Sequence, residues 1–190
     1  TMAEHVINDL SGRIDMIIQD DTVDIGVEST IIDLSEEVPT ILRPGYITQA
    51  MFEEAIGKTI IDPAIMGSLK EGVIPKAPGM KYKHYSPKAE VVIADQYINR
   101  QVSEKEAEGH RCAVMATDET KDKYICNDIV SAGHKDDELS VARNLYAILR
   151  DFDKQKVEYV YSESFETKNV GQAVMNRLIK AAGHKIVKLD

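Results

Sequence analysis

The chain has 190 residues and a formal net charge of −9, with 43% hydrophobic and 29% charged residues. This length suits one large domain or two small ones, and the composition is ordinary for a soluble globular protein. The negative charge argues against sequence-independent binding along a nucleic-acid backbone, and the longest apolar runs are too short to span a membrane. An RNA contact would need a local basic patch such as Lys81–Lys88.

Cysteine and histidine usage predicts neither a disulfide nor a metal site. Cys112 and Cys126 lie too far apart for a CxxC motif, which favours two reduced, partly buried thiols in a cytoplasmic protein. The five histidines show no metal-ligand spacing to one another. The N-terminal residues contain no charged-then-apolar segment of the kind that directs export.

The first 57 residues are predicted to mix helices and strands. Thr1–Glu4 has the pattern of a capping box, and apolar residues on one face continue the helix to Leu10. A short apolar run at Ile14–Ile18 has strand character. Gly26–Leu34 begins with small and polar residues and ends with β-branched ones, which indicates a loop that leads into a strand.

A further strand and a helix complete this part. Pro39–Leu42 is predicted to be a strand that ends at a Pro-Gly turn. Thr48 suits the N-cap of a helix, and Gly57 suits the position just after its C-terminus. The apolar face of this helix is expected to hold Met51, Phe52, Ala55 and Ile56.

Residues 58–88 show no sustained period and contain four of the six prolines, so we interpret them as an interdomain linker. Within it, Pro78–Pro87 combines prolines and a glycine with lysines, a histidine and tyrosines. The prolines keep the segment out of helices and central strands, while lysine suits phosphate and tyrosine suits stacking. A solvated basic linker is the alternative interpretation. We expect instead a lid that orders over a nucleotide.

Residues 89–190 alternate strands and helices regularly. This alternation predicts a parallel sheet covered by helices on both faces, a small Rossmann-like domain. Neither GxGxxG nor a P-loop pattern is present, so the topology alone predicts no cofactor. Strands are expected at Glu90–Ala94, Arg111–Ala116, Tyr124–Val130, Tyr159–Tyr161 and Lys185–Leu189, and the clearest helices at Ser140–Phe152 and Asn169–Ala182.

Two short motifs in the first part carry groups suited to binding. Ser29 and Thr30 lie at the mouth of a predicted strand, where hydroxyls can donate to and accept from a small polar ligand. Arg43 precedes a rigid Pro-Gly turn that would hold its planar guanidinium toward a phosphate or carboxylate. Each motif alone is also common in proteins without such a site. We recognise no nucleophile–base pair and assign no catalytic residue, so an enzyme of this sequence would work by positioning and charge stabilisation.

Together these motifs closely resemble a known family. Gly26–Thr30 (GVEST), Leu42–Gly45 (LRPG) and Ala77–Pro87 (APGMKYKHYSP) are similar to segments of the long-form threonylcarbamoyl-adenylate synthases, which are YrdC-like enzymes with an additional C-terminal domain. Ala142–Tyr146 and Ala173–Leu178 agree as well. The resemblance covers essentially the whole chain. It implies an α/β protein in which residues 1–57 end a twisted-sheet catalytic domain, residues 58–88 form the linker and residues 89–190 form the Rossmann-like accessory domain.

The resemblance also implies a reaction, in which L-threonine, bicarbonate and ATP give L-threonylcarbamoyladenylate and pyrophosphate for the modification of tRNA. Carried over by motif, Ser29 would contact threonine, Arg43 would contact the ATP phosphates and Tyr85 would contact the nucleotide. ATP would be a substrate accompanied by Mg²⁺. Transfer RNA and tRNA-modification enzymes are the implied partners.

Two departures from the family pattern qualify this reading. The turn before the GVEST motif holds Asp20-Asp21 where the family has a glycine pair, although aspartate tolerates left-handed turns. The family's Lys-x-Arg and Ser-x-Asn motifs, which supply most of the ATP site, do not occur upstream of GVEST. We therefore expect a C-terminal fragment that is inactive alone.

Two other readings stay open at this point. Residues 89–190 could bind RNA or a partner protein in a non-catalytic module, with residues 1–57 merely packing against them. A receiver-like regulatory domain would instead need an acidic pocket at the strand ends, for which Asp95 and Asp118 are the evident candidates.

Overall fold

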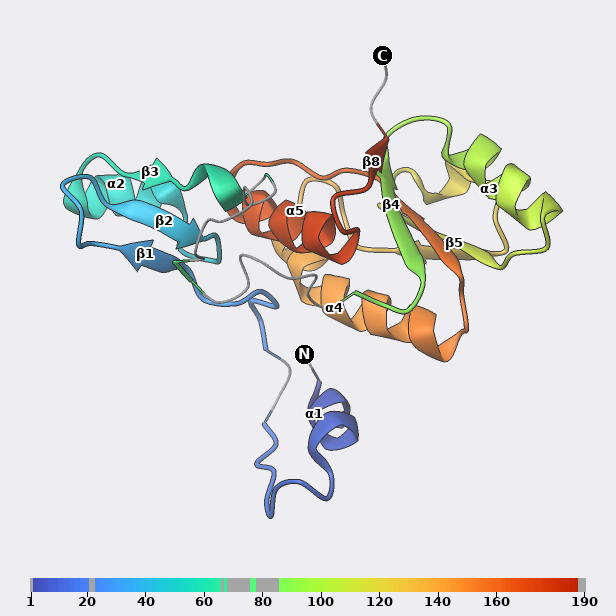
Figure 1. The fold of residues 1–190 in the computed structure, drawn as a ribbon, viewed down its shortest axis with the longest axis horizontal. Coiled ribbons are helices and arrows are strands. Elements are labelled where there is room, and N and C mark those ends of the chain that lie inside the picture. The colour runs from blue at the N-terminus through green and yellow to red at the C-terminus, as the bar shows by residue number, and fades with distance from the viewer. Residues whose placement is uncertain (1, 21–22, 66, 68–75, 78–85, 188–190) are drawn as a thin grey trace.

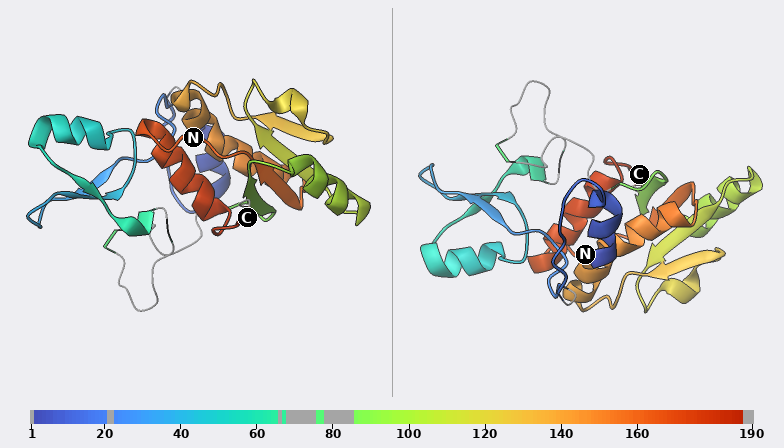
Figure 2. Two further views of the ribbon diagram at one scale, coloured as in Figure 1. Left: turned by 90° about the horizontal axis from the view of Figure 1, so that it is seen from above. Right: turned by 90° about the horizontal axis from the view of Figure 1, so that it is seen from below.

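A computed structural model describes residues 2–20, 23–65, 67, 76–77 and 86–187. A small three-stranded sheet with one helix is followed by a five-stranded sheet with helices on both faces, and a short N-terminal helix lies beside the larger part (Figures 1 and 2). This arrangement confirms the predicted α/β fold class. The segment Pro78–Tyr85, which contains Tyr85, lies outside the described residues, so the lid stays a sequence-based prediction.

The N-terminal helix α1 (Ala3–Leu10) forms as predicted, but its capping differs from the expectation. Met2 is the N-cap residue, and its backbone N–H donates to His5 Nδ1 at 3.3 Å. Thr1 lies outside the described residues. The strand expected at Ile14–Ile18 is wrong, since only an isolated bridge between Ser11 and Ile14 forms there. A strand needs a neighbour to complete its hydrogen bonds, and no described strand lies alongside these residues.

The small sheet has the order β1-β2-β3. β1 (Ile31–Asp33) pairs antiparallel with β2 (Thr40–Arg43), and β2 pairs parallel with β3 (Ile60–Ile61). A 3₁₀ turn at Pro63–Ile65 follows. Residues 60–65 thus have regular structure inside the range that we interpreted as a linker, and the three domain boundaries remain a prediction.

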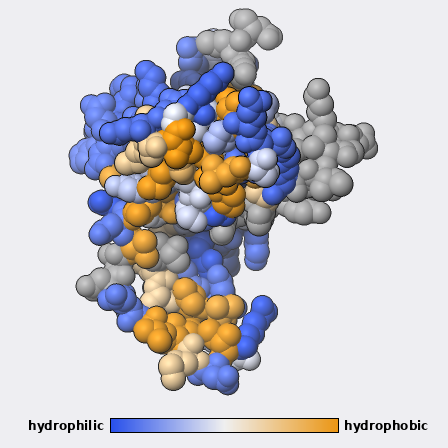
Figure 3. All heavy atoms as spheres, turned by 90° about the vertical axis from the view of Figure 1, so that its left-hand side faces the viewer, coloured by the Kyte–Doolittle hydropathy of each residue, from blue (hydrophilic) through white to orange (hydrophobic). Residues whose placement is uncertain are grey.

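Helix α2 (Gln49–Ile56) confirms its predicted caps but not a buried face. The Thr48 hydroxyl accepts a hydrogen bond from the Met51 amide at 3.3 Å, and Gly57 has φ 83°. No residue of this helix is buried, and Met51 and Ile56 are 45% and 49% exposed. Figure 3 shows hydrophobic side chains gathered on this side of the molecule, at the small sheet and α2 and again at the N-terminal segment.

The large sheet is parallel throughout, with the order β6-β5-β7-β4-β8. Four of its strands lie close to their predicted positions. β6 starts later than predicted, because a 3₁₀ turn at Lys121–Lys123 and an irregular stretch precede it. The strands are β4 (Glu90–Ala94), β5 (Cys112–Ala116), β6 (Asp128–Ser131), β7 (Tyr159–Ser162) and β8 (Ile186–Val187).

Helices cover both faces of the large sheet. α3 (Ile98–Ala107) packs on one face, and α4 (Glu138–Lys154) and α5 (Asn169–Ala181) pack together on the other. Asp137 caps α4 by accepting from the Leu139 and Ser140 amides at 3.1 Å each. None of the described helices combines the length and apolar character needed to cross a bilayer.

Helix α5 is central to the molecule because it lies between the two sheets (Figure 1). Its apolar stripe, which includes Val174 and Leu178, belongs to the main core of the large domain. On other sides the polar residues Asn176, Arg177 and Lys180 are also buried. A helix that is buried on nearly all sides is a core helix, so α5 forms the interface between the small sheet and the large domain.

Candidate functional site

The GVEST loop, residues 26–30, is fixed by close backbone packing. Gly26 has φ 70°, and a Cβ atom there would lie 2.4 Å from the Arg143 Cα of α4. The Arg143 Nε also donates to the Asp24 carbonyl oxygen at 2.6 Å. Glycine is therefore required where the loop rests on the accessory domain.

The structure brings two of the three predicted site residues together. Arg43 donates from Nε to the Ser29 carbonyl oxygen at 3.0 Å and from Nη2 to the Ser29 hydroxyl at 3.2 Å. The turn after Arg43 packs on the same loop, since a Cβ atom at Gly45 would lie 2.3 Å from the Glu28 carbonyl oxygen. Tyr85, the third predicted residue, lies outside the described residues.

Glu28 connects the GVEST loop to two helices of the accessory domain. Its carboxylate accepts hydrogen bonds from the Tyr146 hydroxyl of α4 at 2.7 Å and from Nε of Arg177 on α5. The Arg177 side chain is 3% exposed and that of Glu28 is 26% exposed. Burial raises the pKa of Glu28, but the charge of Arg177 and the hydrogen bonds from Arg177 and Tyr146 outweigh it, so the net pKa lies below the ordinary value.

Further contacts from α5 reach the small sheet and the turn that follows it. Arg177 Nη1 donates to the Asn176 Oδ1 at 2.6 Å, and Arg177 Nη2 lies 3.5 Å from the Pro44 carbonyl oxygen. The Asn176 amide donates to the Ile65 carbonyl oxygen. These neighbouring side chains thus hold the loop, the turn and the start of the linker against one helix.

Sequence reasoning missed the roles of Tyr146, Asn176 and Arg177. The available signal was the polar pair Asn176-Arg177, placed between the apolar residues Val174 and Leu178 in a helix predicted to be buried. A buried charge requires a partner, and the sequence alone could not show which carboxylate provides it.

Lys180 is a second buried cation of α5, one turn beyond Arg177. It is 9% exposed. Burial lowers its pKa to about 8, and the positive charges of Arg177 and Arg43 add to this effect while Glu28 opposes it. Three cations and one carboxylate therefore share the region around Lys180.

A pocket of about 760 Å³ lies on the other side of this network, between α1, residues 23–28 and α4. Glu28 and Tyr146 line it, together with His5 of α1. Two hydrogen bonds, at 2.7 and 2.9 Å, join the Arg150 guanidinium to the Asp9 carboxylate and hold α1 against α4. The network around Glu28 is thus reached from a hollow on the surface.

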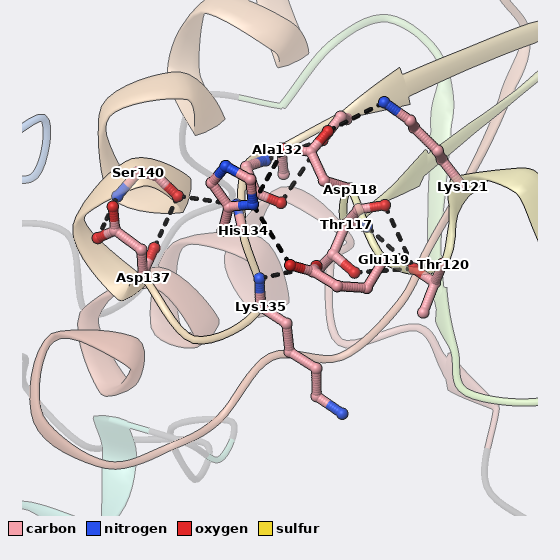
Figure 4. Close-up of polar contacts among 12 residues, drawn as sticks. Thr117, Asp118, Glu119, Thr120, Lys121, Ala132, His134, Lys135, Asp137 and Ser140 are labelled. Atoms are coloured by element: carbon pink, nitrogen blue, oxygen red, sulfur yellow. Dashed lines mark hydrogen bonds and ion pairs between the residues drawn. The ribbon is translucent and has the colours of Figure 1, made fainter.

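The carboxyl edge of the large sheet carries a separate group of polar residues (Figure 4). His134 Nδ1 lies 3.3 Å from Glu119 Oε1 and 3.5 Å from Asp118 Oδ2, and Lys121 Nζ lies 3.0 Å from Asp118 Oδ1. Asp95 accepts from the amide and hydroxyl of Ser164 at 3.0 and 2.5 Å. Both candidate strand-end aspartates are therefore engaged by neighbouring side chains.

The donor set offers no protein-held metal site in the described part of the chain. No group of three or more His, Cys, Asp or Glu residues there could hold a metal ion. Glu28, the carboxylate beside Arg43 and Lys180, is already bound by Arg177 and Tyr146. These residues do not fit the Mg²⁺ that the family resemblance implies.

Two sequence families match the chain. Residues 47–183 match the family described as threonylcarbamoyl-AMP synthase, C-terminal domain, and residues 1–45 match a family described as telomere recombination. Among curated relatives, the threonylcarbamoyl-AMP synthase of Bacillus subtilis is 38% identical over 191 residues, which cover 99% of this chain and 54% of that protein. The synthase of Pyrococcus abyssi is 39% identical over 196 residues, 100% of this chain and 55% of the relative.

Solved structures agree with the sequence matches. The crystal structure of P. abyssi Sua5 complexed with L-threonine is similar with a TM-score of 0.88 and 38% identity, covering 100% of this chain and 56% of that one. The chain spans about half the length of the curated relatives it matches. It belongs to the threonylcarbamoyl-AMP synthase (Sua5) family, of which it covers the end of the YrdC domain and the C-terminal domain.

Proposed function

We propose that the protein to which this chain belongs forms L-threonylcarbamoyladenylate and pyrophosphate from L-threonine, bicarbonate and ATP, for threonylcarbamoyladenosine in cytoplasmic tRNA. The observation that carries this proposal is the Arg43 guanidinium held on the GVEST loop by Ser29. Family membership supports the reaction, and the L-threonine in the P. abyssi structure supports the substrate.

In this proposal Arg43 stabilises phosphate charge. Arginine has five N–H donors, and Ser29 accepts from two of them, which leaves three for a ligand. Both contacts to Ser29 are made to neutral oxygens, so the positive charge stays available. A guanidinium fixed in this way stabilises developing charge without reorganising during the reaction.

Ser29 would orient threonine beside Arg43. Its side chain is exposed, and its hydroxyl accepts from Arg43, so the hydroxyl proton remains free to be donated to a carboxylate or hydroxyl of the amino acid. Tyr85 is proposed as a nucleotide contact on the strength of its motif alone. Transfer RNA and tRNA-modification enzymes remain the proposed partners.

The exposed apolar surface supports an incomplete catalytic domain in this chain. Ile47, Met51, Ile56 and Ile60 are each more than 40% exposed, around the small sheet and α2 (Figure 3). Contiguous exposed apolar surface on a soluble protein usually marks an interface. We propose that the part of the relatives that precedes the matched region packs on this surface and supplies the remaining ATP contacts.

A chimera tests the proposal. It joins the part of the B. subtilis relative that precedes the matched region to this chain. Isothermal titration with L-threonine in the presence of ATP should show binding that Ser29→Ala weakens about tenfold, the effect of one lost hydrogen bond to a charged group. Ser35→Ala, at an exposed loop residue whose hydroxyl donates to Asp33, is the matched control and should leave binding unchanged. Equal threonine affinity of the chimera with and without Ser29→Ala would remove Ser29 from the site.

A further inference from the structure

We propose that Lys180 of α5 and Arg43 of β2 together form one binding site for a polyphosphate, so that the accessory domain contributes a cation to the catalytic domain. The proposal deepens the proposed function, on which it rests for the identity of the natural polyphosphate. Nothing in the family resemblance assigned a role in binding to a residue of α5.

The first step is the position of Lys180. Residues three apart on a helix share a face, so Lys180 lies beside Arg177, whose guanidinium contacts Glu28 and the Pro44 carbonyl oxygen. Pro44 directly follows Arg43 in the chain. Lys180 is therefore placed where α5 meets the end of β2.

The second step is the lack of a partner for Lys180. It is 9% exposed, yet within the described ranges of the chain it makes no hydrogen bond or ion pair. An ammonium group taken out of water without a partner is strongly unfavourable. The depressed pKa of about 8 expresses the same cost, which Arg177 and Arg43 increase.

The third step is the balance of charge. Glu28 is bound by Arg177, so that pair is neutral. Arg43 contacts only the carbonyl and hydroxyl oxygens of Ser29 among the residues that the structure describes. Two positive charges, on Arg43 and Lys180, therefore remain without a counter-charge at one interface.

A polyphosphate fits this pair by charge and geometry. The planar guanidinium of Arg43 can bind two phosphate oxygens, while lysine acts as a point charge on a flexible stem. A single carboxylate would neutralise only one of the two charges. The triphosphate of ATP and released pyrophosphate share this chemistry, and the experiment separates them.

The test uses this chain and inorganic pyrophosphate as the probe. Lysine side chains labelled with ¹³C are followed by NMR while the pH is varied, with and without pyrophosphate at millimolar concentration. A nearby anion favours the charged amine, so pyrophosphate should raise the pKa of Lys180 by roughly one unit. The shift should shrink in Arg43→Met, while Lys168, exposed at the start of α5, should not respond.

Affinity is measured in the same chain. Lys180→Met keeps the buried stem and removes the charge, and it should weaken pyrophosphate binding about tenfold or more, as expected for a lost hydrogen bond between charged groups. Lys180→Arg should retain part of the binding, and Lys168→Met should bind as the unaltered chain does. An unaltered chain that does not bind pyrophosphate, or a Lys180→Met chain that binds it equally well, would overturn the proposal.

The natural source is separated in the chimera. If the site holds the ATP triphosphate, Lys180→Met should raise the KM for ATP. If it holds the product, the variant should weaken inhibition by pyrophosphate and leave the KM for ATP unchanged. A loss of tRNA binding with both phosphate readouts unaltered would contradict a polyphosphate site. The titrations of the isolated chain do not need synthesis of the adenylate, so a silent chimera with a responsive Lys180 would refute the proposed reaction and leave the site intact.

Discussion

The Arg177 guanidinium, on a helix of the accessory domain, donates from Nε to the carboxylate of Glu28, which precedes Ser29 in the GVEST loop. The two residues are 149 positions apart in the chain. Because Arg177 is almost fully buried, this ion pair is a fixed part of the interface between the domains. The loop that carries Ser29 is consequently held by the accessory domain as well as by its own sheet.

Breaking this pair should destabilise the chain strongly. Arg177→Met or Glu28→Gln leaves a charge without its partner, for which we expect a loss of about 2–4 kcal/mol in the free energy of unfolding, reduced from the fully buried case because Glu28 is partly exposed. The double variant should lose clearly less than the sum of the two. Urea unfolding measures these values. Arg100→Met, which breaks an exposed pair with Glu104, is the control and should cost less than about 1 kcal/mol.

The acid limb of stability should depend on Glu28. Its pKa is lowered in the folded chain, so its contribution is present above the unfolded pKa and is lost as the pH falls through the folded one. Between pH 6 and pH 3 the unaltered chain should therefore lose more stability than Glu28→Gln does. Parallel pH profiles from thermal or urea unfolding would contradict the assigned ion pair.

Lys180 should produce the opposite trend at alkaline pH. Its pKa is lowered from 10.5 to about 8, so between these values the unfolded chain holds the extra proton and the free energy of unfolding rises with pH. We expect a gain on the order of 2 kcal/mol for the unaltered chain relative to Lys180→Met across this window. The difference between the two chains is the measured quantity, because tyrosines titrate nearby in pH. A constant difference would show that Lys180 is solvated.

Much of the large domain was predictable from periodicity. The residues of β4, β5 and β7, and of α4 and α5, follow patterns set by burial of one or both faces, and these patterns are local in sequence. Ile14–Ile18 has the same apolar character, but a strand also needs a partner, which a local pattern does not supply. The exposed face of α2 has the same origin, since its amphipathic pattern specifies a face and not what covers it.

The site was predictable only in part, for a related reason. Ser29 and Arg43 were found because each has a distinctive local motif, and they meet because β1 and β2 are adjacent strands. Arg177 and Lys180 were not found, because their significance depends on contacts across more than 130 residues of sequence. A charged residue in a buried helix signals a partner without naming it.

Arg43 should be irreplaceable by lysine in the chimera. Arg43→Ala should reduce kcat/KM for ATP by about 2–3 kcal/mol of transition-state stabilisation, similar to the loss of one preorganised donor. Arg43→Lys should recover only part of this, because lysine keeps the charge but cannot keep both contacts to Ser29 while binding phosphate. Full activity of Arg43→Ala would remove Arg43 from the phosphate site.

This chain by itself should form no adenylate, since the described site contains two cations without a counter-charge but no Lys-x-Arg motif. Pyrophosphate release from ATP, measured with threonine and bicarbonate both present, is the readout. Release that requires both substrates would show that the 190 residues are sufficient.

The most direct measurement is detection of the product itself. The chimera, incubated with ATP, ¹⁴C-bicarbonate and L-threonine, should yield labelled L-threonylcarbamoyladenylate, resolved by chromatography and identified by mass. Arg43→Ala should abolish the product without changing the melting temperature by more than a few degrees. If a folded chimera forms no labelled adenylate, or if Arg43→Ala forms as much as the unaltered chimera, the role of this chain in adenylate synthesis is contradicted.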